Sequence, residues 1–126
     1  MCPSASLPVY PNPLGTTGTV AERARSYLQA NCSHCHRPGG GTPVNLDLRY
    51  SNAMSATNTC GVTPSDPLGI TGAKVIAPGN PDASILYVRM SQRGANQMPP
   101  ISTNVVDAAG AALLRQWISG MNSSCQ

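Results

Sequence analysis

The sequence predicts an all-α fold of three to four helices joined by long loops. Two segments, one near each end, repeat apolar residues at helical spacing. No segment alternates apolar and polar residues in the way a half-buried strand does. The 126 residues include 12 Gly and 12 Pro, a content that suits long loops. This length is typical of one domain.

The first predicted helix follows a proline-rich start. Residues 1–18 hold four prolines and two glycines, so we expect an extended strap or linker before a domain that covers residues 19–126. Thr19 and Glu22 form a capping-box pattern at the start of a helix that should end near Asn31. One face of this helix is apolar and holds Val20, Ala24, Tyr27 and Leu28.

The middle of the chain predicts mostly loops. Residues 37–45 form a glycine-rich loop, and residues 46–50 are expected to make one helical turn. Residues 51–80 have the Gly, Pro, Ser, Thr and Asn content of a long irregular segment. A second helix is expected over residues 81–91, with Asn80 as its N-cap.

The last helix is expected to begin at Asn104. Gly120 is a suitable residue for its C-terminal end. Its apolar face consists of Val106, Gly110, Leu113, Leu114, Trp117 and Met121.

The motif Cys32-Ser33-His34-Cys35-His36 holds the candidate functional residues. Two thiols separated by two residues can form thioethers with the two vinyl groups of one haem, and the following histidine then becomes an axial iron ligand. A thioredoxin-like redox pair is disfavoured because a helix, and not a buried strand, precedes the motif. A zinc site with Cys32, Cys35, a histidine and Cys60 would need an unusual spacing. A simple Cys32–Cys35 disulfide would leave His36 without a role.

Met98 is the predicted second axial ligand of the iron. Histidine and methionine are a common ligand pair in cytochromes c. Met98 lies in the sequence Gln97-Met98-Pro99-Pro100, where the following proline restricts its backbone to extended geometry. The alternative is that Met98 only fills a gap in the core.

Composition and charge exclude several other classes. The net charge is +3 and the basic residues are scattered, so a nucleic-acid-binding surface is not expected. No segment reaches the length of about 20 apolar residues that spans a membrane. The start has no signal-peptide pattern, so either an export signal has been removed or the chain is a piece of a longer protein. Five cysteines favour an oxidising, extracytoplasmic compartment over the cytosol.

From Thr19 onward the chain resembles a class I cytochrome c, and in particular the haem domains at the C-terminal end of larger exported bacterial proteins. The stretches that carry the resemblance are YLQANCSHCHRPGG, NLDLRY, GAKVIAPGNPDASILYVRM, MPP and LLRQWISGM. The resemblance implies one covalent haem c and single-electron transfer. The expected partners are a dehydrogenase donor and an oxidase or copper-protein acceptor, or a fused catalytic domain. The alternative function is a haem peroxidase or a gas-sensing haem domain, which would need an open iron position.

The resemblance also assigns roles around the haem. Ala24 and Tyr27 of the first helix should meet Gly110 and the residues that follow it in the last helix. The carbonyl of Pro43 should accept a hydrogen bond from His36 Nδ1 and orient that ring. The residue before this proline is Thr42 where the family usually has glycine. Arg49 is a candidate partner for a haem propionate, with a solvated surface arginine as the alternative.

Three cysteines lie outside the motif. We expect Cys60 and Cys125 to form a disulfide, which would tie the 51–80 segment to the C-terminus across about 65 residues. Cys2 would then be left over, as a lipid-modified cysteine or as the partner of one of the others. The sequence leaves this connectivity open.

Overall fold

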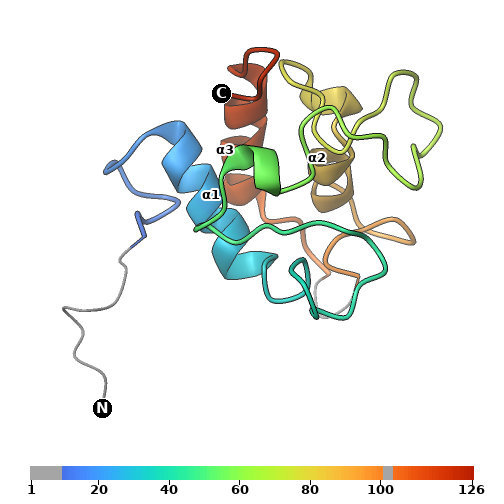
Figure 1. Cartoon of the computed structure of the whole chain (residues 1–126), viewed down its shortest axis with the longest axis horizontal. Coiled ribbons are helices and arrows are strands. Elements are labelled where there is room, and N and C mark those ends of the chain that lie inside the picture. The colour runs from blue at the N-terminus through green and yellow to red at the C-terminus, as the bar shows by residue number, and fades with distance from the viewer. Residues whose placement is uncertain (1–9, 101–103) are drawn as a thin grey trace.

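The computed structural model describes residues 10–100 and 104–126, and within them the secondary structure is helical, apart from two isolated backbone bridges (Figure 1). The predicted all-α class is therefore confirmed. In chain order the elements are α1 (Val20–Asn31), the 3₁₀ helices η2 (Met54–Ala56) and η3 (Pro81–Ala83), α2 (Ile85–Met90) and α3 (Ala108–Ser119).

Helix α1 begins and ends as predicted. The Thr19 hydroxyl accepts from the Glu22 N–H at 3.1 Å, and the Glu22 carboxylate accepts from the Thr19 N–H at 3.2 Å. This reciprocal pair satisfies donors that the first turn would otherwise leave unpaired. At the other end, the Cys32 N–H donates to the Leu28 carbonyl. The cysteine motif thus continues directly from the helix.

Helices α1 and α3 pack face to face around the core (Figure 1). A Cβ at Gly110 would lie 2.5 Å from Tyr27 Cζ, so the ring of Tyr27 rests on the backbone of α3. This confirms the expected meeting of Tyr27 with Gly110. The buried core around this contact includes Ala24, Leu28, Leu113, Leu114, Trp117, Ile118 and Met121.

Helix α3 starts later than predicted. Asp107, and not Asn104, is the N-cap, because its carboxylate accepts the Gly110 N–H at 3.0 Å. Residues 104–107 lie outside the helix, and the Val105 side chain is exposed. Gly120 closes the helix as expected.

The second predicted helix is broken at Ser84. Residue Ser84 has an extended backbone between η3 and α2, so the helix expected over 81–91 is two short pieces. The fully buried Ser84 hydroxyl donates to the carbonyls of Ala77 and Asn80 and accepts the Ala77 N–H. Asn80 makes no side-chain cap. These bonds to the preceding loop replace helical ones.

The helical turn expected over residues 46–50 is absent. The Leu48 N–H donates to the His36 carbonyl at 2.8 Å, and the Tyr50 N–H donates to the Gln29 side chain at 2.8 Å. The segment is therefore extended along α1 and the cysteine motif.

Residues 51–80 lack long regular elements, as predicted, but they are firmly packed. Ile76 is fully buried, and the hydroxyls of Thr57 and Thr59 lie 2.8 Å apart in the interior. A backbone bridge pairs Cys60 with Ile76. This segment is part of the core and not an excursion from it.

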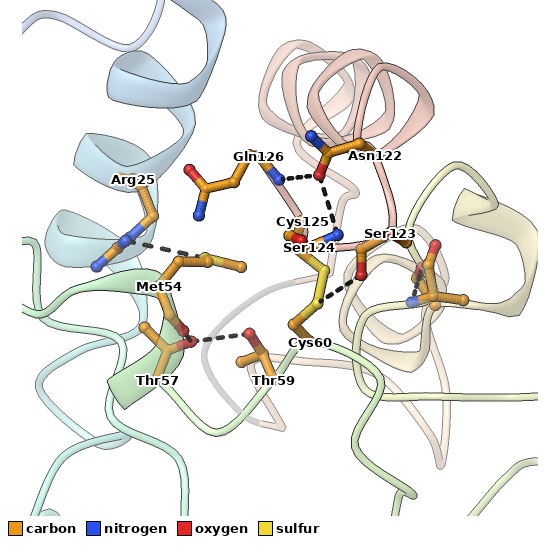
Figure 2. The surroundings of a disulfide bond; sticks show 12 residues. Arg25, Met54, Thr57, Thr59, Cys60, Asn122, Ser123, Ser124, Cys125 and Gln126 are labelled. Carbon is orange, nitrogen blue, oxygen red and sulfur yellow. Dashed lines mark hydrogen bonds between the residues drawn. A yellow bond between two sulfur atoms is a disulfide. The ribbon is translucent and has the colours of Figure 1, made fainter.

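The predicted disulfide between Cys60 and Cys125 is present, with the two Cα atoms 6.0 Å apart. Figure 2 shows it beside the C-terminal turn, where the Asn122 side-chain oxygen accepts from the N–H groups of Ser124 and Gln126. The bond fixes the 51–80 segment to the C-terminal turn that follows α3. Cys2 lies outside the described residues.

The chain before α1 turns back onto the fold. The ring of Tyr10 lies 4.3 Å from the ring of Tyr50, centroid to centroid. The Gly15 N–H donates to the Asn12 carbonyl. Among the described helices, none is long and apolar enough to cross a membrane.

Candidate haem-binding site

One cavity gathers the four residues that the sequence predicts as haem and iron ligands. It has a volume of about 440 Å³, and Cys32, Cys35, His36 and Met98 all line it. Ligand-binding pockets in proteins have volumes of about 300–1,000 Å³. Its apolar walls come from α1, the extended segment after the motif, the 51–80 segment and α2, and include Leu28, Leu46, Leu48, Val75, Ile85 and Leu86.

The cysteine motif forms a tight turn at the end of α1. The N–H groups of Cys35 and His36 both donate to the Cys32 carbonyl, at 3.2 and 2.9 Å. The carbonyl of His36 accepts from the Leu48 N–H. Gly40 lies so close to the Cys35 backbone that a Cβ there would be 2.7 Å from its carbonyl carbon. The glycine-rich run thus folds back against the motif.

The two motif thiols are free and differ in exposure. Cys35 is exposed and Cys32 is partly exposed, and neither takes part in a disulfide. Burial, and secondarily the nearby Cys35, raises the pKa of Cys32 to about 11. A thiol with that pKa is protonated at neutral pH. Because both thiols are free, the Cys32–Cys35 disulfide considered as an alternative is not formed in this structure.

His36 is held in a protected environment. Burial lowers its pKa, and the adjacent His34 lowers it further. The neutral imidazole that results is the form that can bind a metal ion. His34 also lines the cavity. A place in the cavity wall therefore does not by itself distinguish His36 from His34 as the iron ligand.

Met98 reaches the cavity from a loop attached to α2. Its N–H donates to the Arg89 carbonyl at 2.9 Å, which joins the loop to the last turn of α2. The Gln97 N–H donates to the Gly94 carbonyl, and the Gln97 side chain donates to the Pro99 carbonyl. Backbone and side-chain bonds thus fix the loop on both sides of Met98. Met90 also lines the cavity, from α2 itself.

The hydrogen bond expected between His36 and Pro43 is not formed. His36 Nδ1 is buried and has no hydrogen-bond partner. Pro43 is exposed and is not part of the cavity wall. Next to it, the Thr42 hydroxyl donates to the Val44 carbonyl at 3.2 Å, within a turn that faces solvent. The buried, unpaired Nδ1 leaves His36 with a donor position still to be satisfied.

Arg49 also differs from its expected role. Its guanidinium forms two hydrogen bonds with the Asp47 carboxylate, at 2.6 and 2.8 Å, and it does not line the cavity. Two other arginines, Arg89 and Arg93, do line the cavity. Arg89 lies 3.8 Å from the Asp66 carboxylate. The sequence does not single out either arginine as a residue of the cavity wall.

The alternative of a zinc site is disfavoured because Cys60 cannot serve as a ligand. Cys60 is bonded to Cys125 and has no thiolate to offer. In the described ranges, no three His, Cys, Asp or Glu side chains are grouped so that they could hold a metal ion. Two thiols, the imidazoles of His34 and His36, and the thioethers of Met90 and Met98 line the cavity among apolar walls. Thiols that can form thioethers, together with imidazole and methionine ligands for the iron, are the groups that hold a c-type haem.

Sequence reasoning missed the part of the wall that comes from residues 64–66. Pro64, Ser65 and Asp66 line the cavity. No motif marks them, and only the tertiary ion pair between Asp66 and Arg89 shows their position.

A scan against protein-family models and searches of curated proteins and of solved structures found no match to this chain.

Proposed function

We propose that this protein is a mono-haem c-type cytochrome that transfers single electrons. One observation carries the proposal: Cys32, Cys35, His36 and Met98 line the same largely apolar cavity. His36 and Met98 are 62 residues apart in sequence, so their meeting is a product of the fold and adds to the evidence from the motif.

The protein residues divide the work of holding the haem. The Cys32 and Cys35 thiols would form the thioethers, and His36 and Met98 would bind the iron. When bound, the haem supplies the redox-active iron. A thioether ligand favours the reduced iron and raises the reduction potential. The apolar walls would limit the contact of the haem with water.

The firmly held Met98 loop favours electron transfer over the alternative of a peroxidase or gas-sensing domain. Those activities need an open iron position, and Met98 would occupy it. The N–H of Met98 is bonded to Arg89, and prolines follow it, so the loop has little freedom to withdraw. We therefore propose no catalytic residue for this chain.

The proposed setting is an extracytoplasmic compartment, such as the bacterial periplasm. The Cys60–Cys125 disulfide is of the kind that persists in oxidising compartments. The proposed partners are redox proteins: a dehydrogenase as donor and an oxidase or copper protein as acceptor, or a fused catalytic domain. Such electron-transfer contacts are weak and small in area.

Absorption spectra of the chain produced with cytochrome c maturation machinery test the proposal. We expect haem to remain attached after denaturation and a methionine–iron charge-transfer band to be present in the oxidised protein. The band should vanish in Met98→Leu and persist in the matched variants Met90→Leu and Met54→Leu. Loss of the band in Met90→Leu alone would identify Met90 of α2 as the axial ligand.

Two other spectra would contradict the proposal. A haem protein that is high-spin when oxidised and lacks the band would support the peroxidase or gas-sensing alternative. A colourless protein would exclude haem attachment altogether.

A further inference from the structure

Arg93 has hydrogen-bond donors that the protein leaves unsatisfied beside the cavity. Its Nη2 donates to the Met90 carbonyl at 2.9 Å and lies 3.4 Å from the Met98 carbonyl. Its Nε and Nη1 atoms are buried and have no partner. Leaving a buried donor unpaired costs about 1–3 kcal/mol, and more when the group is charged. An acceptor is therefore needed at this position.

None of the carboxylates of the chain forms an ion pair with Arg93. It contains five acidic residues, and all of them lie in the described ranges. Asp107 also lines the cavity, but it accepts from Tyr27 at 2.8 Å and from Gly110. The other four are engaged elsewhere: Glu22 in the α1 capping box, Asp47 with Arg49, Asp66 with Arg89 and Asp82 with Arg115.

We propose that Arg93, and not Arg49, binds a carboxylate of the haem, an inference that rests on the proposed function. A haem carries two propionate carboxylates, and Arg93 is a cavity-lining cation whose free donors suit such an acceptor. Because the same guanidinium contacts the Met98 carbonyl, it also connects the bound haem to the loop that carries the axial methionine. Arg93 is a binding and positioning residue.

Other arginines fit this role less well. Arg23 and Arg25 each have a buried Nε without a partner, but neither lines the cavity. Arg25 already donates to the carbonyls of Arg49 and Asn52. Arg89 lines the cavity and has the Asp66 carboxylate as its neighbour. Arg93 combines a place in the wall with two unpaired nitrogens.

The midpoint potential of the haem-loaded protein, followed from about pH 5 to pH 9, tests this inference. In the wild type, Arg93 keeps this carboxylate ionised throughout, so the carboxylate adds no pH dependence to the potential. In Arg93→Gln, the carboxylate loses its cation and takes up a proton within this range, so the potential falls as the pH rises. Arg93→Lys keeps the charge and should fall less steeply. Arg23→Gln removes the same charge outside the cavity and should follow the wild type.

Several results would overturn the inference. A flat profile in Arg93→Gln would show that Arg93 does not hold the carboxylate, and a slope in Arg49→Gln would assign it to Arg49. A wild-type potential that responds to added inorganic phosphate would indicate a solvent anion in its place. These results leave the proposed function intact if the Met98 band is present. A colourless protein would overturn both.

Discussion

Replacing Gly110 with alanine tests how closely α1 and α3 approach each other. The new Cβ would lie 2.5 Å from Tyr27 Cζ, whereas non-bonded carbon atoms are comfortable at about 3.5–4.0 Å. The ring and the helix must therefore separate by about 1 Å. Tyr27 has little room to move, because it is buried and its hydroxyl donates to Asp107.

The magnitude follows from two opposing terms. Overpacking of this kind costs about 1–3 kcal/mol. Alanine in place of glycine inside a helix stabilises the folded state by about 0.5–1 kcal/mol. The midpoints of the two ranges leave a net loss, so we expect Gly110→Ala to lower the free energy of unfolding by about 1 kcal/mol. Urea denaturation measures this change, and an unaltered m-value would show that the denatured state is unaffected.

Gly120→Ala is the matched control at the end of the same helix. A Cβ there would lie 3.6 Å from its nearest neighbour, the Gln116 carbonyl oxygen, and the φ of −89° is open to alanine. We expect it to be neutral or slightly stabilising. In a Tyr27→Leu background the cost of Gly110→Ala should largely disappear. Equal stability of the two alanine variants, or an undiminished cost in that background, would refute the close approach.

Three further predictions concern stability. Replacing Cys60 and Cys125 with alanine should lower the free energy of unfolding by about 2–4 kcal/mol, read from urea curves, because the 65-residue crosslink is lost; unchanged curves would contradict a structural role for the bond. Hydrogen bonds from Gly110 and Tyr27 lower the pKa of Asp107, so its contribution is complete above about pH 4 and is lost as the pH falls through its folded pKa. Asp107→Asn should therefore lose less stability than the wild type between about pH 4 and pH 2 in acid titrations followed by circular dichroism, and parallel curves would speak against this. Arg25→Leu should cost about 1–3 kcal/mol because it leaves the carbonyls of Arg49 and Asn52 without their donor, whereas the exposed Arg37→Leu should change urea midpoints little.

Features with a local cause could be predicted from the sequence. The α1 start follows from the reciprocal bonds of Thr19 and Glu22, which are three residues apart. The buried face of α3 follows from its apolar spacing. The place of Cys35 and His36 at the end of α1 follows from the motif.

Features that depend on tertiary contacts could not be predicted from the sequence. Leu48 and Tyr50 lose their helical turn to partners 12 and 21 residues away in sequence, His36 and Gln29. Ser84 breaks the second helix because its buried hydroxyl bonds to the preceding loop. Of the eight basic residues, nothing local distinguishes Arg93, whose role depends on which of the five acids are already paired.

The Cys60–Cys125 bond also divides the molecule covalently. It closes residues 60–125 into a ring that contains Met98, while α1 and the Cys32–His36 motif belong to an open arm outside it. A single backbone cut anywhere between residues 61 and 124 leaves one connected molecule. A cut between residues 37 and 59 separates the arm, with both thiols and His36, from the ring that holds the second axial ligand. Limited proteolysis under non-reducing conditions would thus yield halves in the second case alone, each carrying one side of the proposed iron site.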